Sequence, residues 1–151
     1  EEVPQPLRVV LDSTLRMSAE SRMLTLPGRT LVLCARRDEN RAGRLERAGA
    51  RVVEMQSDEG HVFLPDALAY LADLQINEVL IEAGPTVAGE ALREGVIDEV
   101  VIYMAPHLMG DNARGLFHLP WLNQMEHRLN LEIREVRQIG ADFRITVIPE
   151  R

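Results

Sequence analysis

The stretch LIEAGPTVAGEAL, residues 80–92, joins an apolar run to residues at helical spacing. The apolar run ends in a carboxylate, Glu82, and Gly84-Pro85-Thr86 then forms a turn that leads into the helix-like part. A glutamate is seldom buried without a partner, so its place directly after an apolar run requires a reason. Glu82 either caps the turn or contacts a ligand, and the rest of the chain has to decide between these interpretations.

The composition favours one globular domain that binds no polyanion. The chain has 151 residues, 46% of them apolar, which is enough for one domain with a substantial core. Its net charge of −7, without a block of Lys or Arg, disfavours nucleic acid and anionic membranes as partners. The single cysteine, Cys34, excludes an internal disulfide and fits a reducing compartment. Because no apolar run reaches about 18 residues and no signal peptide is recognisable, we expect a cytoplasmic protein with a single domain over residues 1–151.

Short β-rich runs alternate with helical patterns along the chain. We predict strands at residues 7–11, 30–34, 51–54, 78–82 and 98–105, and helices at 41–48, from Pro65 onwards and at 85–94. The run at 78–82 is apolar throughout its middle, which is typical of a central strand. Asn40 is the expected N-cap of the first helix, with Gly49 directly after its end.

The C-terminal part has a different pattern. Residues 131–137 and 142–148 alternate polar and apolar side chains, and Gly140 lies between them, which predicts an antiparallel hairpin. The earlier alternation of strands and helices predicts a largely parallel sheet with helices on both faces. We therefore expect the α/β class, with a mixed doubly wound sheet and the hairpin at one edge. In such sheets a ligand binds outside the carboxyl ends of the strands.

Glu82 lies at the carboxyl end of the predicted central strand, where a ligand is expected. Gly84 allows close approach of a backbone, and Pro85 presets the first helical turn. The N–H groups of Thr86, Val87 and Ala88 would then point out of the helix start and form an anion site suited to a diphosphate. A plain strand-to-helix turn with an incidental glutamate is the alternative.

Other candidate residues follow the same logic. Ser13, after Asp12, ends the first predicted strand, either as part of the ligand site or as a polar turn. Arg16 and Arg114 could meet an anion or be solvated loop residues. No histidine pair has metal-ligand spacing, and the chain contains no P-loop, G-x-G-x-x-G, G-x-S-x-G or zinc deaminase motif. We therefore expect neither a metal site nor a serine nucleophile.

Four stretches occur together in a familiar order: LRVVLDSTLRM, EVLIEAGPTVAGEAL, GVIDEVVIYMAPHLMGDNARGLF and the closing hairpin. With them the chain resembles the reductase domain of the riboflavin biosynthesis protein RibD, which has a dihydrofolate-reductase-like fold. The resemblance implies reduction of 5-amino-6-(5-phosphoribosylamino)uracil to the ribitylamino form with NADPH. It implies that Glu82 contacts the substrate, and that subunits join as a homodimer through the C-terminal strands. The cofactor-binding residues that it implies are Ser13, Gly84, Pro85, Thr86, Val87, Ala88, Gly89 and Glu90.

The chain also departs from that pattern. It contains none of the deaminase motifs that many full-length members carry, and no K-x-A-x-S-x-D-G-like strand opens it. It resembles only the later two-thirds of the reductase domain, so we expect residues 1–151 alone to be inactive. No acid or base residue is identified, although Glu82 is the one candidate. A pteridine or dihydrofolate-type reductase and a non-catalytic assembly module remain as alternative functions.

Overall fold

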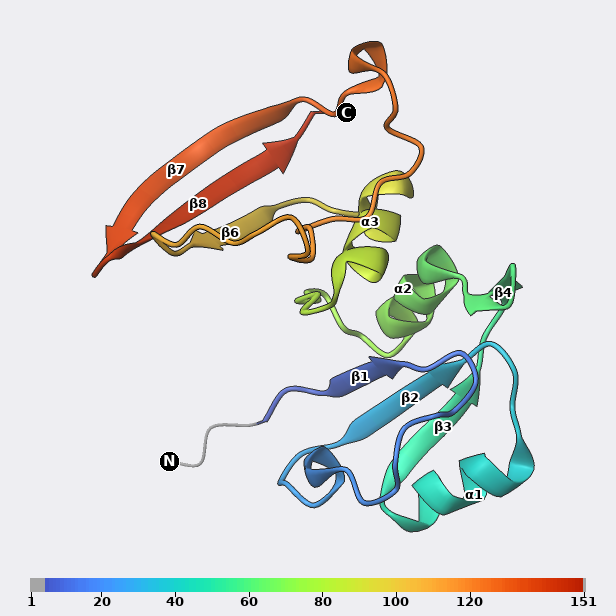
Figure 1. The fold of residues 1–151 in the computed structure, drawn as a ribbon. Coiled ribbons are helices and arrows are strands. Elements are labelled where there is room, and N and C mark those ends of the chain that lie inside the picture. The colour runs from blue at the N-terminus through green and yellow to red at the C-terminus, as the bar shows by residue number, and fades with distance from the viewer. Residues whose placement is uncertain (1–4, 151) are drawn as a thin grey trace. The chain divides into compact units, whose positions relative to one another are not determined.

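The computed structural model describes residues 5–150, and these form two compact units that divide between Asn77 and Glu78. Figure 1 shows the elements of both units. The single domain over residues 1–151 stays a prediction.

A three-stranded parallel sheet forms the centre of the first unit. Its strands are β1 (Arg8–Leu11), β2 (Thr30–Cys34) and β3 (Ala50–Glu54), in the order β1-β2-β3. All five residues of β2 are buried, as expected for a middle strand that is covered on both faces. The three strands predicted in this part of the chain are confirmed.

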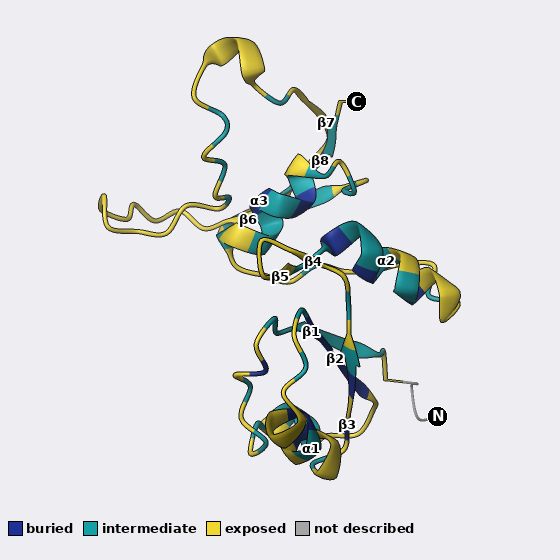
Figure 2. Cartoon of the chain, turned by 90° about the vertical axis from the view of Figure 1, so that its right-hand side faces the viewer, coloured by how far each residue is buried: buried dark blue, intermediate teal, exposed yellow. Residues whose placement is uncertain are grey.

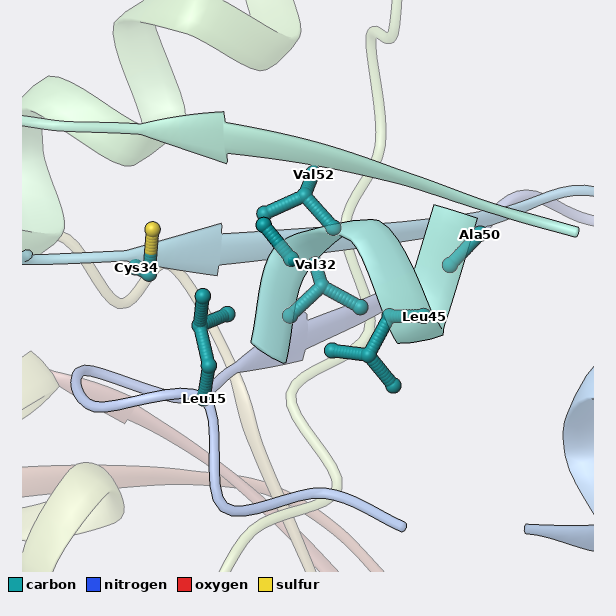
Figure 3. Close-up of a cluster of buried hydrophobic side chains, with 7 residues drawn as sticks. Leu15, Val32, Cys34, Leu45, Ala50 and Val52 are labelled. Carbon is teal, nitrogen blue, oxygen red and sulfur yellow. The ribbon is translucent and has the colours of Figure 1, made fainter. Parts of the chain in front are cut away.

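Helices cover both faces of this sheet, which explains the unbroken apolar run of β2. Val32 and Cys34 pack on one side with Leu45 of α1 (Glu39–Arg47), as Figure 3 shows together with Leu15 and Val52. On the other side, α2 (Leu64–Asp73) contributes to a second cluster whose buried members are Leu31, Leu33, Ala67 and Leu71. The doubly wound arrangement predicted from the sequence is therefore present in this unit.

The N-cap of one helix differs from the sequence prediction. The N-cap of α1 is Asp38, whose side chain accepts a hydrogen bond from the Arg41 N–H at 2.9 Å, so the prediction of Asn40 was wrong. Both residue types are good caps, and the helix begins earlier than its apolar spacing indicated. In α2, Leu71 is buried, whereas Leu74 at the C-cap is 36% exposed.

A short hairpin was missed by the sequence analysis. It consists of β4 (Ser57–Asp58) and β5 (His61–Val62), and the two residues between them, Glu59 and Gly60, have φ values of 47° and 82°. Two successive residues with positive φ are what a type I′ turn requires. The Glu59-Gly60 pair was its only sequence signal, and strands of two residues have no periodicity to detect. A single turn of 3₁₀ helix, η1 (Arg22–Leu24), also lies in this unit.

The second unit contains α3 (Pro85–Arg93) and an antiparallel sheet in the order β6-β8-β7. Its strands are β6 (Val100–Met104), β7 (Leu131–Ile139) and β8 (Asp142–Pro149), and η2 (Met125–His127) precedes β7. Gly140, with φ 62°, lies in the tight turn between β7 and β8. The predicted hairpin is confirmed, and β8 rather than β7 is its inner strand (Figure 1).

Residues 78–82 do not form the predicted central strand. They have no strand assignment, and Val79 and Leu80 are 41% and 79% exposed. A strand exists only when a neighbour completes its hydrogen-bonding ladder, and no described strand pairs with this segment. The parallel and antiparallel strands consequently form separate sheets. Figure 2 shows buried segments, in dark blue, in the sheet of the first unit and on α2. All nine residues of β7 are exposed.

Candidate functional site

The start of α3 presents backbone donors that the helix itself does not use. Gly84 is the N-cap, with extended backbone and no side-chain hydrogen bond to the helix, and Pro85 is the first helical residue. The Ala88 N–H donates to the Gly84 carbonyl at 3.2 Å and closes the first turn. The N–H groups of Thr86 and Val87 precede this bond and remain available to a ligand.

This geometry corrects one of the sequence predictions. Ala88 was expected to offer its N–H to an anion, but that group is already engaged within the helix. The helix begins at Pro85, so the fourth helical N–H is the first to find an intrahelical partner. The backbone donors of the predicted anion site are therefore those of Thr86 and Val87.

Glu82 lies two residues before the N-cap and is exposed. Between residues 5 and 150, its carboxylate has no hydrogen-bonding or ion-pair partner. At Gly84, no atom lies within 4 Å of the point where a Cβ would stand. The Glu82 carboxylate is thus exposed just before the start of α3, which fits both the ligand interpretation and a plain strand-to-helix turn.

Gly89 and Glu90 have partners within this unit. A Cβ on Gly89 would lie 2.1 Å from the carbonyl oxygen of His118, so the absence of a side chain allows that segment to pack on the helix. Glu90 forms an ion pair with Arg93, with Oε2 to Nε at 2.9 Å. Their contact with a cofactor stays a prediction. The sequence analysis missed the packing at Gly89, for which an isolated glycine inside a helix was the available signal.

Ser13, the remaining predicted cofactor residue, belongs to the first unit. Its hydroxyl oxygen accepts a hydrogen bond from the Val62 N–H at 3.2 Å, and its carbonyl accepts from the N–H groups of Ala35 and Arg36. The preceding Asp12 accepts from the Met17 N–H at 2.6 Å. These bonds fix the loop after β1, as the polar-turn interpretation expects, and leave the proton of the Ser13 hydroxyl available for donation.

Leu15 completes this loop in an uncommon conformation. Its φ is 54°, in the left-handed region that a branched side chain rarely adopts, and its side chain is only 2% exposed. Figure 3 shows Leu15 in the cluster with Val32 and Cys34. Burial of the side chain therefore holds the backbone of the Ser13 loop in a conformation that it would otherwise avoid.

The other candidates lie at the surface or in the core. Arg16 and Arg114 are exposed, and Arg114 follows a turn in which the Ala113 N–H donates to the Gly110 carbonyl. Cys34 is fully buried and packs as a small apolar residue, and desolvation raises the pKa of its thiol, with Glu54 and Asp12 adding to the effect. Within residues 5–150 no group of three or more His, Cys, Asp or Glu side chains is placed to hold a metal ion. No helix in the same range is long and apolar enough to cross a membrane.

Comparison with known proteins places these features in a family. Residues 1–145 match the RibD C-terminal domain. The chain is 35% identical over 138 residues to the riboflavin biosynthesis protein RibD of Escherichia coli, covering 91% of this chain and 36% of that protein. It is 27% identical over 146 residues to a protein of Buchnera aphidicola named 5-amino-6-(5-phosphoribosylamino)uracil reductase, covering 97% and 69% of the two chains.

Solved structures agree with this result. RibD of Acinetobacter baumannii superposes with a TM-score of 0.82 at 32% identity, over 98% of this chain and 39% of that one. The match confirms both the resemblance drawn from the sequence and the α/β, dihydrofolate-reductase-like fold class. The chain spans between 36% and 40% of the length of the first RibD relatives that it matches.

Proposed function

Since the chain belongs to the RibD C-terminal domain family, we propose that, within an intact reductase domain, it serves the NADPH-dependent reduction of 5-amino-6-(5-phosphoribosylamino)uracil in riboflavin biosynthesis. The product is the ribitylamino form of the pyrimidine. The observation that carries this proposal is the family match over residues 1–145, which contains the E-A-G-P-T stretch at the start of α3. We propose a cytoplasmic location on the same ground.

The start of α3 fits the phosphate groups of a dinucleotide. The N–H groups of Thr86 and Val87 are available, and the positive end of the helix dipole amounts to roughly half an elementary charge. Gly84 leaves the space beside them open. Pro85, Ala88, Gly89, Glu90 and the Ser13 hydroxyl complete the set of cofactor residues that we propose. When bound, NADPH supplies the hydride, and the task of the chain is to bind and orient both ligands.

Glu82 fits the recognition of a polar substrate. Its carboxylate accepts hydrogen bonds only, so it suits hydroxyl or N–H groups, of which the ribose and the pyrimidine have several. A charge-assisted hydrogen bond of this kind contributes roughly 1.5–3 kcal/mol. We assign binding and alignment to Glu82, and no described side chain is assigned as an acid or base.

We further propose that residues 1–151 alone do not turn the substrate over at a useful rate. Glu82 and the apolar side chains before it, Val79 and Leu80, are exposed. Hydride transfer needs the reacting atoms held about 3–3.5 Å apart and shielded from water. A carboxylate in open solvent provides neither condition. Steady oxidation of NADPH by the purified chain with the authentic pyrimidine would contradict this part of the proposal.

A homodimer is the proposed assembly. One edge of β7 pairs with β8, and no described strand pairs with its other edge. The apolar side chains of Ile133 and Val136 on this strand are 65% and 56% exposed. Exposed strand edges with apolar residues invite pairing, and a second copy of the chain would supply a matching strand. Light scattering at micromolar concentration should give twice the monomer mass, whereas a monomer would argue against the dimer.

The exposed β7 also favours the alternative function, a non-catalytic assembly module. NADPH binding separates the two functions. Titration of the chain with NADPH, followed by the change in nicotinamide fluorescence, should give saturable binding if the reductase proposal holds. A chain that assembles but shows no saturable binding would be an assembly module.

A further inference from the structure

Residues 117–119 form a strap that lies along one face of α3. The backbone N–H of His118 donates to the Pro85 carbonyl at 2.9 Å, and the carbonyl oxygen of His118 lies 2.1 Å from the position of a Cβ on Gly89. Pro85 and Gly89 are four residues apart and therefore lie on the same face of the helix. Figure 1 shows this part of the chain, in orange, crossing α3 after it leaves β6.

The first turn of α3 has no side-chain cap. Its N-cap, Gly84, makes no side-chain hydrogen bond to the helix, and the Ala88 N–H closes the turn with a bond of 3.2 Å. An uncapped first turn frays readily, because only tertiary contacts then oppose the gain in backbone entropy. The strap supplies such a contact at the Pro85 carbonyl.

We propose that Gly89 and the backbone of His118 form a clamp that positions the N–H groups of Thr86 and Val87 for the cofactor. The inference rests on the proposed function, because it takes the start of α3 as the phosphate-binding element. Gly89 then acts as a positioning residue: it makes room for the strap, and the strap fixes the first turn. The His118 side chain has no part in the clamp, since only backbone atoms make the contacts.

The geometry sets the size of the perturbation that one methyl group would cause. Real Cβ atoms essentially never approach a neighbour closer than 3.0 Å, so a Cβ at Gly89 forces the His118 carbonyl from 2.1 Å to at least that distance. The strap must then shift by about 0.9 Å. A shift of that size along the His118–Pro85 bond would lengthen it from 2.9 Å to about 3.8 Å, beyond hydrogen-bonding range.

The test compares Gly89→Ala with Gly43→Ala in the full chain. Gly43 also lies inside a helix, α1, but apart from its neighbours and its own helix backbone nothing lies within 4 Å of its Cβ position, so this variant controls for the higher helix propensity of alanine. The readouts are hydrogen exchange of residues 116–120 and NADPH affinity by fluorescence titration. Gly89→Ala should lose protection of the His118 amide and bind NADPH at least tenfold more weakly. Gly43→Ala should match wild type in both.

A second pair of variants keeps the test decisive if Gly89→Ala folds poorly. His118→Pro removes the backbone donor without adding an atom at Gly89, and should weaken NADPH binding in the same way. His118→Ala keeps the donor and should match wild type. If Gly89→Ala loses the protection of the His118 amide, or His118→Pro folds without that donor, and the variant still binds NADPH within twofold of wild type, the clamp inference is overturned while the proposed function stands. If wild type itself does not bind NADPH, the proposed function fails and the inference with it.

Discussion

At Leu15, the stabilisation from side-chain burial and the cost of backbone strain can be compared at one residue. The residue has φ 54° and is 2% exposed, so its conformation opposes the fold while its side chain supports it. The left-handed conformation costs roughly 1–2 kcal/mol for a residue other than glycine. Removal of a buried leucine side chain costs roughly 2–5 kcal/mol. Leu15→Gly changes both contributions at once.

The two effects do not cancel. Glycine relieves the strain, but it loses the packing and adds roughly 0.5–1 kcal/mol of backbone entropy to the unfolded state. We therefore expect Leu15→Gly to lower the free energy of unfolding of the first unit by about 2–3 kcal/mol. Glu59 provides the matched control, because it also has positive φ, at 47°, but is exposed. Glu59→Gly should be neutral or slightly stabilising.

The assay is hydrogen exchange of the β2 amides at increasing urea concentration, supported by urea unfolding followed by circular dichroism. Exchange in β2 reports on the unit that contains Leu15, so it is not averaged with the other unit. If Leu15→Gly proved as stable as wild type, strain relief would equal the lost packing. The conclusion that burial fixes the Ser13 loop would then be refuted.

Four further predictions concern Glu82, Thr86 and Cys34. Glu82→Gln, in an intact form of the domain, should weaken substrate binding by roughly 1.5–3 kcal/mol in a calorimetric titration and weaken NADPH binding less. Unchanged substrate affinity would remove Glu82 from the site. Thr86→Pro should impair NADPH binding, because it deletes one of the two available N–H groups. It should disturb folding little, because the first helical turn tolerates proline. Wild-type affinity in a fluorescence titration would locate the phosphate site elsewhere. Cys34 should resist thiol reagents at neutral pH in the folded chain, because it is buried and its pKa is raised; rapid labelling would contradict its burial. Because the pKa of the Cys34 thiol is raised in the folded chain, the folded thiol holds its proton more tightly than the unfolded one. The stability that the thiol contributes is therefore complete below the ordinary pKa of 9.0 and declines as the pH rises above that value. Thermal melts between pH 7 and pH 11 would measure this decline.

The sequence predicted those elements whose stability depends on neighbours within this chain. β2 was predicted at its observed bounds, because an apolar run between turn signals can only be buried, and α1 and α2 are present to bury it. The hairpin of β7 and β8 was predicted because alternation and a glycine turn are local signals. The likeness to RibD rested on residue identities in stretches such as E-A-G-P-T, and not on periodicity.

The failures have physical causes that can be named. The N-cap of α1 was misplaced because several adjacent polar residues are acceptable caps, and only the backbone decides between them. The β4 and β5 hairpin is too short to leave a periodic pattern. The contact between Gly89 and His118 joins residues 29 positions apart in the sequence, and no local pattern records such a pairing.

In the stretch from Leu80 to Leu92, the predicted helix is confirmed and the predicted strand is wrong, and both outcomes depend on where the hydrogen bonds of each element are formed. Its helical half folds as predicted, because a helix forms its hydrogen bonds within its own segment, and the strap adds one tertiary contact. Its strand half does not, because a strand forms its hydrogen bonds only with a neighbour, and the described residues supply none. Leu80 is therefore exposed, and the carboxylate of Glu82 unpartnered, for the same reason: no described strand pairs with residues 78–82. A strand that paired with residues 78–82 would bury Leu80 and hold Glu82 against the start of α3, so substrate affinity at Glu82 should depend on that pairing, whereas the N–H groups of Thr86 and Val87 are in place without it.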